Sequence, residues 1–218
     1  ALVRWRHPVW GFQSPGEFIP LFEQNGFITK LDQYVWERAA SVLREWDNRG
    51  YPPIPVSVNV SRADIYHKDL ADMLLGIVRR YRLQPSRLHL EITESAYTEN
   101  PEQVIETVGY LRELGFVIEM DDFGSGYSSL NLIQSIPVDT LKIDKVFFKD
   151  KTMELDRLKA VVGGIIRMSH SLSMVTVAEG VEYREQVEML KQEGCDYIQG
   201  YIFDKPMNIA SFEQKAFG

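Results

Sequence analysis

Short β-rich runs alternate with longer amphipathic stretches along nearly the whole chain, and this order constrains the fold more than any other feature. The runs rich in apolar and β-branched residues are seven predicted strands: Ala1–Arg6, Pro55–Val60, Leu88–Thr93, Phe116–Asp121, Thr140–Asp144, Met174–Glu179 and Tyr197–Phe203. The other stretches have helical periodicity: Thr29–Arg49, Arg62–Arg82, Pro101–Leu114, Tyr127–Ser135, Met153–Ser171, Arg184–Glu193 and Asn208–Phe217. This order is typical of parallel strands joined by crossover helices, so it predicts an α/β protein.

Two α/β architectures are compatible with this order, an open doubly wound sheet and a closed barrel. The open sheet usually has a glycine-rich phosphate loop after an early strand, and the sequence has none there. A barrel instead has reactive side chains at the carboxyl ends of many strands, as this chain does. We therefore predict a (β/α)8 TIM-like barrel over residues 1–218, with its first N-terminal strand missing because seven strands are counted.

Composition limits the class of protein. The 218 residues suit one large domain with an ordinary hydrophobic share of 44%. No apolar run approaches the roughly 18 residues needed to cross a bilayer. With Cys195 as the only cysteine, no intramolecular disulfide can form, which fits a reducing compartment. We expect a cytoplasmic domain, although a longer parent protein could still be anchored in a membrane.

The net charge of −7 argues against DNA or RNA as a partner. An acidic site can still bind a phosphodiester when divalent cations lie between the two sets of negative charge. The sequence therefore leaves room for a phosphate-bearing ligand of a metal-dependent protein.

Polar side chains end several predicted strands, at what should be one end of the barrel: Asn59, Glu91, Asp121, Asp122, Lys142, Glu179 and Gln199. Of the adjacent pair, Asp121 should face inward and Asp122 should lie at the rim. Buried carboxylates need paired or bound cations. Oxygen ligands of this kind favour Mg²⁺ or Mn²⁺ over zinc. The neighbouring Asp121 and Asp122 could share two metal ions, and Lys142 could orient water or neutralise developing charge.

Each residue also has a purely structural interpretation. Glu94 could be half of an ion pair, residues 122–126 could form only a turn, and Lys142 with Asp144 could form an interior salt bridge. The histidines share no metal-ligand spacing and are interpreted as structural or surface residues. These interpretations do not easily explain why so many polar groups fall at equivalent strand ends.

The motifs occur in an order and spacing that together are specific, although none decides alone: Ala1–Trp5, Ser14–Pro20, Val58–Ser61, Glu91–Ser95, Asp121–Leu130, Leu141–Lys145, Ala178–Glu182, Gln199–Tyr201 and Lys205-Pro206. In these motifs the chain resembles the EAL domain, the bacterial phosphodiesterase of cyclic di-GMP signalling. The resemblance implies hydrolysis of one phosphodiester of cyclic di-GMP to linear pGpG, with two Mg²⁺ or Mn²⁺ ions.

The resemblance also implies roles for individual residues. Metal ligands would be Asn59, Glu91, Asp121 and, at a second ion, Asp122. Lys142 would position the attacking water, Glu179 would act in acid/base chemistry, and Glu94 would brace the loop after Asp122. The residues expected to contact the nucleotide are Leu2, Arg4, Gln199, Glu182 and Pro206.

The family is named for Glu-Ala-Leu, and this sequence starts at the Ala. Because the Glu is a metal ligand in the family, metal binding and turnover are expected to fall steeply without it. The alternatives are a receptor that binds cyclic di-GMP without cleaving it, and another two-metal barrel hydrolase with a different phosphoester substrate.

The resemblance further implies a homodimer formed through the loop and helix after Asp122, and a sensor or cyclase domain upstream in the parent protein. The segment Gly124-Ser125-Gly126 can flex, so a dimer contact there would set how well Asp121 and Asp122 are placed.

Overall fold

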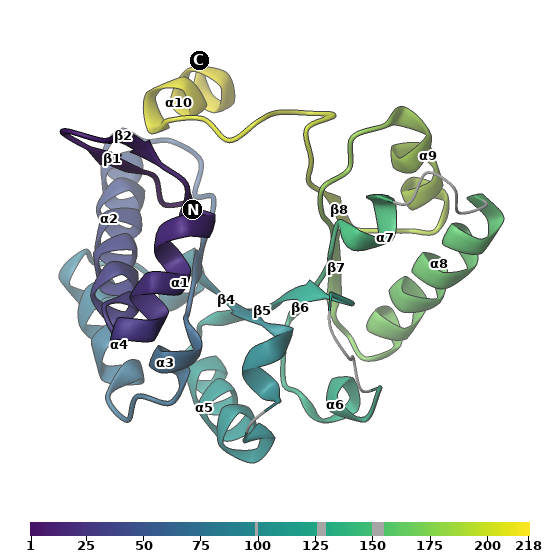
Figure 1. Ribbon diagram of the computed structural model, residues 1–218, viewed down its shortest axis with the longest axis horizontal. Coiled ribbons are helices and arrows are strands. Elements are labelled where there is room, and N and C mark those ends of the chain that lie inside the picture. The colour runs from purple at the N-terminus through teal and green to yellow at the C-terminus, as the bar shows by residue number, and fades with distance from the viewer. Residues whose placement is uncertain (99, 126–129, 150–154) are drawn as a thin grey trace. The chain divides into compact units, whose positions relative to one another are not determined.

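The computed structural model describes residues 1–98, 100–125, 130–149 and 155–218. The chain divides into two compact units. The first comprises Ala1–Ile92 and Glu99–Ile118, and the second comprises Thr93–Thr98 and Glu119–Gly218. Figure 1 labels most of the helices and strands of both units.

Six strands form one sheet in which each strand is paired with the next along the chain: β3 (Val56–Asn59), β4 (Leu88–Thr93), β5 (Val117–Phe123), β6 (Thr140–Ile143), β7 (Val175–Ala178) and β8 (Tyr197–Ile198). The pairs β3–β4, β5–β6, β6–β7 and β7–β8 are parallel. Helices lie between successive strands in the sequence, so the predicted α/β class is confirmed.

The first predicted strand is wrong in its extent and its partner. The sequence predicts a strand over Ala1–Arg6, whereas β1 (Trp5–His7) pairs antiparallel with β2 (Gly11–Gln13) in a separate two-stranded sheet. The Ala1 amino group does donate a hydrogen bond to the Ser57 carbonyl oxygen of β3. Apolar alternation indicates an extended segment, but it does not specify which strand pairs with it.

Two helices precede β3, and the sequence predicts one of them. Helix α2 (Ile28–Asn48) matches its prediction closely and contacts β3, with Trp36 and Leu43 fully buried. Helix α1 (Pro15–Asn25) was not predicted, since Pro20 lies inside it and prolines usually break helices. Phe18 is buried on α1, and its ring packs edge-on against Trp5.

The predicted helix Arg62–Arg82 is wrong as a single element. It divides into α3 (Arg62–Ile65) and α4 (Leu70–Arg80), and the backbone N–H of Asp69 between them bonds to His67 Nδ1 at 3.2 Å. A short 3₁₀ turn (Pro85–Arg87) leads into β4. Helix α5 (Pro101–Glu113) has Asn100 as its N-cap, and the Asn100 side chain accepts a hydrogen bond from the Gln103 N–H.

The second unit contains one 3₁₀ turn and five helices among its described residues: η2 (Glu94–Tyr97), α6 (Leu130–Ser135), α7 (Val146–Lys149), α8 (Leu155–Ser171), α9 (Arg184–Gln192) and α10 (Ile209–Phe217). The predicted starts at Tyr127 and Met153 lie outside the described residues. A core of buried side chains from α7, α8 and α9 packs with Ile143 and Ala178 of the sheet.

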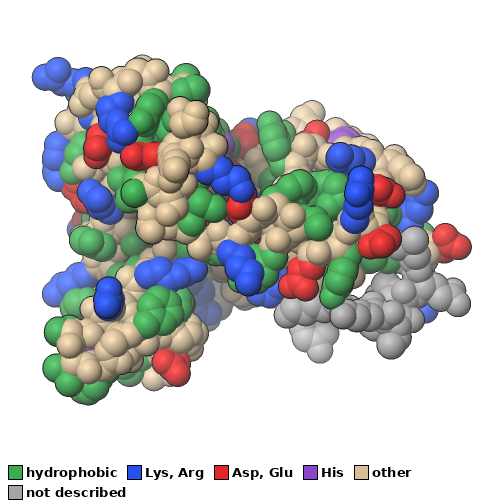
Figure 2. Space-filling model, turned by 90° about the horizontal axis from the view of Figure 1, so that it is seen from above, with side chains coloured by type: hydrophobic (Ala, Val, Ile, Leu, Met, Phe, Trp, Pro, Cys, Tyr) green, Lys and Arg blue, Asp and Glu red, His purple; other side chains and the backbone are tan. Residues whose placement is uncertain are grey.

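Acidic, basic and apolar side chains are interspersed on the face drawn in Figure 2. Within the described ranges, no helix combines the length and apolar character that a membrane span needs.

Candidate functional site

In the first unit, Asn59 and Glu91 lie side by side at the carboxyl ends of β3 and β4. Asn59 Nδ2 donates a hydrogen bond to Glu91 Oε2 at 3.3 Å, and Glu91 is only 8% exposed. The Trp36 indole donates to the backbone oxygen of Asn59 at 2.9 Å, which fixes this strand end against α2. An amide oxygen beside a carboxylate is a donor set that suits a hard divalent cation.

In the second unit, Lys142 of β6 lies between two carboxylates. Its Nζ is 2.9 Å from Asp121 Oδ1 and 2.8 Å from Glu179 Oε1, and its side chain is 6% exposed. The Glu179 N–H donates to the Ile143 carbonyl oxygen at 2.9 Å, so Glu179 directly follows the paired end of β7. The polar ends of three strands therefore meet in one cluster.

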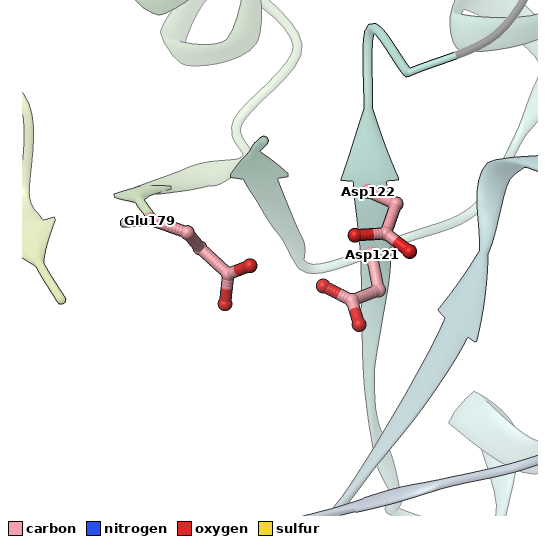
Figure 3. A group of neighbouring side chains, drawn as sticks. All are labelled: Asp121, Asp122 and Glu179. Carbon is pink, nitrogen blue, oxygen red and sulfur yellow. The ribbon is translucent and has the colours of Figure 1, made fainter. Parts of the chain in front are cut away.

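Asp121 and Asp122 are consecutive residues near the end of β5, yet both carboxylates face the same region as Glu179 (Figure 3). In a regular strand consecutive side chains point to opposite faces. Here the β5–β6 register shifts between Met120 and Phe123, and Asp122 has a φ of 56°. This irregularity turns the second carboxylate toward the cluster, as bulges near functional sites do.

The environment of Asp122 disfavours its charged form. Burial, the neighbouring charge of Asp121 and a hydrogen bond with Asp144 raise the pKa of Asp122 to about 6, and Lys142 opposes this shift. Asp144 is itself buried and fixed, since its Oδ1 accepts a 2.7 Å bond from the Val146 N–H. The cluster thus carries more negative charge than the single ammonium of Lys142 neutralises.

Asp121, Asp122 and Glu179 fit a divalent cation. One oxygen of each lies within 4.8 Å of the others, which is a spacing that one ion can bridge. Asp121 Oδ1 is buried and lies 2.9 Å from the Lys142 ammonium. Because Glu179 shares that ammonium, a divalent cation would further offset the charge of the three carboxylates.

Glu94 holds the loop that follows Asp122. Its Oε2 accepts a 2.9 Å hydrogen bond from the Gly124 N–H, and its side chain is buried at 5% exposure. Residues 126–129 of the same predicted loop lie outside the described residues.

The predicted nucleotide contacts are all exposed and occur in both units. Leu2 and Arg4 belong to the first unit, and Arg4 Nη1 donates to the Val3 carbonyl oxygen. Gln199, Glu182 and Pro206 belong to the second unit. The Gln199 backbone is fixed by bonds to Ala178 and Val181, while its side chain is exposed.

The sequence prediction missed two features of this site. Asp144 was considered as a salt-bridge partner of Lys142, but its hydrogen bond with Asp122 was not foreseen. The bulge that brings Asp122 beside Asp121 was also missed. The signal for it in the sequence was the Asp-Asp pair ahead of Gly124. In a regular strand one of two adjacent carboxylates would point into the apolar core, where carboxylates are rare.

The fold and the acidic cluster define an α/β protein with a candidate divalent-cation site at strand ends. The sequence matches the EAL domain over residues 1–206, so the chain belongs to the EAL domain family.

Relatives and solved structures agree with this membership. The chain is 38% identical to the cyclic di-GMP phosphodiesterase NbdA of Pseudomonas aeruginosa, covering 98% of this chain and 27% of that protein. It is 36% identical to the bifunctional diguanylate cyclase/cyclic di-GMP phosphodiesterase MucR of the same organism, covering 95% of this chain and 30% of MucR. The chain thus spans only about a quarter of the length of the curated relatives it matches.

A solved structure of the PaMucR phosphodiesterase in complex with c-di-GMP matches with a TM-score of 0.90 and 34% identity, covering 97% of this chain and 85% of that one. EAL domains have the TIM-barrel-like fold, so the predicted barrel class is confirmed at the level of the family.

Proposed function

We propose that this domain is a metal-dependent phosphodiesterase that hydrolyses cyclic di-GMP to linear pGpG. The observation that carries the proposal is Lys142, buried between Asp121 and Glu179 with Asp122 beside them. The names of NbdA and MucR support the substrate, as does the nucleotide bound to the PaMucR structure.

Asp121 and Asp122 would hold two Mg²⁺ or Mn²⁺ ions, and Asn59 and Glu91 would supply further oxygen ligands. When bound, the ions supply positive charge that offsets the phosphodiester and makes the attacking water more acidic. The close spacing of Asp121, Asp122 and Glu179 and the raised pKa of Asp122 support this assignment, because a divalent cation offsets the repulsion between these carboxylates.

Glu179 would accept the proton of the attacking water. It lies at the edge of the cluster, with Oε1 bonded to Lys142 and the backbone fixed to β6. Lys142 is an ammonium paired with two carboxylates, so it would donate a hydrogen bond to the water and orient it rather than remove its proton. Glu94 would act indirectly, by holding the Gly124 backbone.

For the nucleotide itself, we propose contacts from Leu2, Arg4 and Gln199, with Glu182 and Pro206 near a guanine. The exposure of these five side chains leaves them accessible to a ligand. We further propose a cytoplasmic homodimer that uses the loop and helix after Asp122. A sensor or cyclase domain in the parent protein is proposed from the greater length of the relatives.

The direct test incubates the chain with cyclic di-GMP in Mg²⁺, Mn²⁺ or EDTA and separates bound nucleotide from product by chromatography. Metal-dependent pGpG, lost in Glu179→Gln, is the expected result. Tight binding without product would favour a receptor. The same assay on a longer chain with Glu directly before Ala1 would separate that outcome from a missing ligand. A folded protein that binds no cyclic di-GMP would disprove the proposal.

A further inference from the structure

The backbone just beyond Asp122 is held from two sides. Gly124 has a φ of 93°, and a Cβ at this position would overlap the ring of Phe147. The ring therefore lies directly against the Gly124 α-carbon, while Glu94 accepts the N–H of the same residue at 2.9 Å. Because Ser125 N–H bonds back to the Asp122 carbonyl oxygen, this turn is continuous with the carboxylate-bearing residue.

The backbone just beyond Glu179 has a similar contact. Gly180 has a φ of 64°, and a Cβ there would overlap the Cβ of Lys145. Lys145 and Phe147 are two residues apart at the start of α7. That start is fixed by Asp144, whose carboxylate accepts the Val146 N–H and whose own N–H bonds to the Phe123 carbonyl oxygen.

One short segment, Asp144–Phe147, thus contacts the residues that follow both Asp122 and Glu179. We propose that Phe147 is a positioning residue: its ring, packed on Gly124, keeps the Asp122 carboxylate facing Glu179. This inference rests on the proposed function, since it assigns Phe147 a role in shaping the cation site. Phe147 itself need not touch metal or nucleotide.

The neighbouring Phe148 offers a matched comparison. Phe148 is 6% exposed and belongs to the core of the second unit, whereas Phe147 is only partly buried and packs at the edge of that core. If Phe147 had a purely structural role, its substitution would lower thermal stability as substitution of Phe148 does, but by less.

The experiment compares Phe147→Leu, Phe147→Ala and Phe148→Leu by Mn²⁺ affinity from calorimetry, kcat and KM for cyclic di-GMP, and thermal stability. Phe147→Ala is expected to weaken Mn²⁺ binding about tenfold, as loss of groups that orient ligands does. Phe147→Leu should show a smaller loss of affinity. Phe148→Leu should lower the melting temperature with unchanged Mn²⁺ affinity.

A second measurement tests the contact directly. Gly124→Ala should weaken Mn²⁺ binding more in the wild-type background than in Phe147→Ala, because removing the ring removes the overlap with the new Cβ. The inference is overturned if the effects of Gly124→Ala and Phe147→Ala on Mn²⁺ affinity are simply additive. It is also overturned if substitutions at Phe147 and Phe148 change thermal stability but not Mn²⁺ affinity. In either case the proposed function stands. A wild-type chain that neither binds Mn²⁺ nor cleaves cyclic di-GMP would refute both.

Discussion

Two groups of carboxylates, one in each unit, are accommodated in different ways. In the first unit, Asp32 of α2 and Asp64 of α3 are 7% and 0% exposed and hydrogen-bonded to each other. In the second unit, Asp121, Asp122 and Glu179 gather at a candidate cation site, and the side chains of Asp121 and Glu179 are 14% and 16% exposed. Both groups bring carboxylates close together, so proximity alone does not distinguish a structural cluster from a functional one.

The difference lies in what neutralises the charge. Burial and the hydrogen bond with Asp64 raise the pKa of Asp32 to about 8, so this pair keeps a proton at neutral pH. Ser61 completes the pair, with its N–H donating to Asp32 at 3.0 Å and its hydroxyl to Asp64 at 2.7 Å. A buried acid pair that holds its own proton needs no metal ion.

The cluster of the second unit uses Lys142 instead, with one ammonium shared between Asp121 and Glu179 and with Asp122 beside them. Its charge is incompletely neutralised by protein groups alone. A divalent cation can bind at such residual negative charge. This charge distinguishes the cluster from the Asp32–Asp64 pair, which holds a proton instead.

The largest expected effect follows from Lys142→Met. The substitution leaves Asp121 and Glu179 without their shared cation and removes the donor proposed to orient water. Turnover of cyclic di-GMP should fall by about a thousandfold at saturating metal. Lys191→Met, at an exposed lysine of α9, is the control for loss of a positive charge. Equal activity losses in the two variants would mean that the pairing of Lys142 has no special role.

A smaller effect is expected from Asp121→Asn, which keeps the shape but removes one anionic ligand. Mn²⁺ affinity measured by calorimetry should fall by about a hundredfold, with thermal stability of the metal-free chain unchanged or higher. The stability should not fall because the neutral amide relieves the repulsion with Asp122. Unchanged Mn²⁺ affinity would remove Asp121 from the proposed ligands.

Glu94→Gln should act more weakly still, through the loop. The amide can still accept the Gly124 N–H but loses the charge that strengthens this 2.9 Å bond. The cost is about 1 kcal/mol, which corresponds to roughly a fivefold loss of kcat/KM. Glu94→Ala should lose more than Glu94→Gln in the same assay. The reverse order would argue against a bracing role.

Much of this architecture could be predicted from the sequence, because strands that are apolar on one face have a clear period and boundary. Six of the predicted runs match the strands of the main sheet, and Asp121, Lys142 and Glu179 lie together as predicted from their strand-end positions. Their chemical roles remain predictions.

The missed features depend on tertiary contacts. The helix α1 forms around an internal proline because Phe18 and Phe22 pack against Trp5, which local propensity does not encode. The bulge at Asp122 needs a positive φ in a residue other than glycine, which no periodic pattern reveals. Likewise, the sequence around Asp32 predicts an ordinary polar residue on a helix. Only the tertiary structure shows that Asp32 is buried beside Asp64.

Asp32→Asn should have the smallest effect on catalysis and a distinct effect on stability. The folded pKa of about 8 lies above the ordinary value of about 3.9. The stabilisation that protonated Asp32 provides is therefore complete below about pH 3.9. It is lost progressively as the pH rises from there through the folded pKa of about 8. Asn is neutral throughout, so Asp32→Asn should remove this contribution to the pH dependence and leave kcat within about twofold, because Asp32 takes no part in the chemistry.

The measurement is urea unfolding of both proteins at about pH 5 and about pH 8. Between these pH values the free energy of unfolding should fall by on the order of 4 kcal/mol more in the wild type than in Asp32→Asn. A matched substitution, Asp69→Asn at an exposed site, should leave the wild-type pH dependence intact. If Asp32→Asn and the wild type follow parallel curves, the pair does not hold a proton. The two acidic clusters would then differ in location but not in how their charge is neutralised.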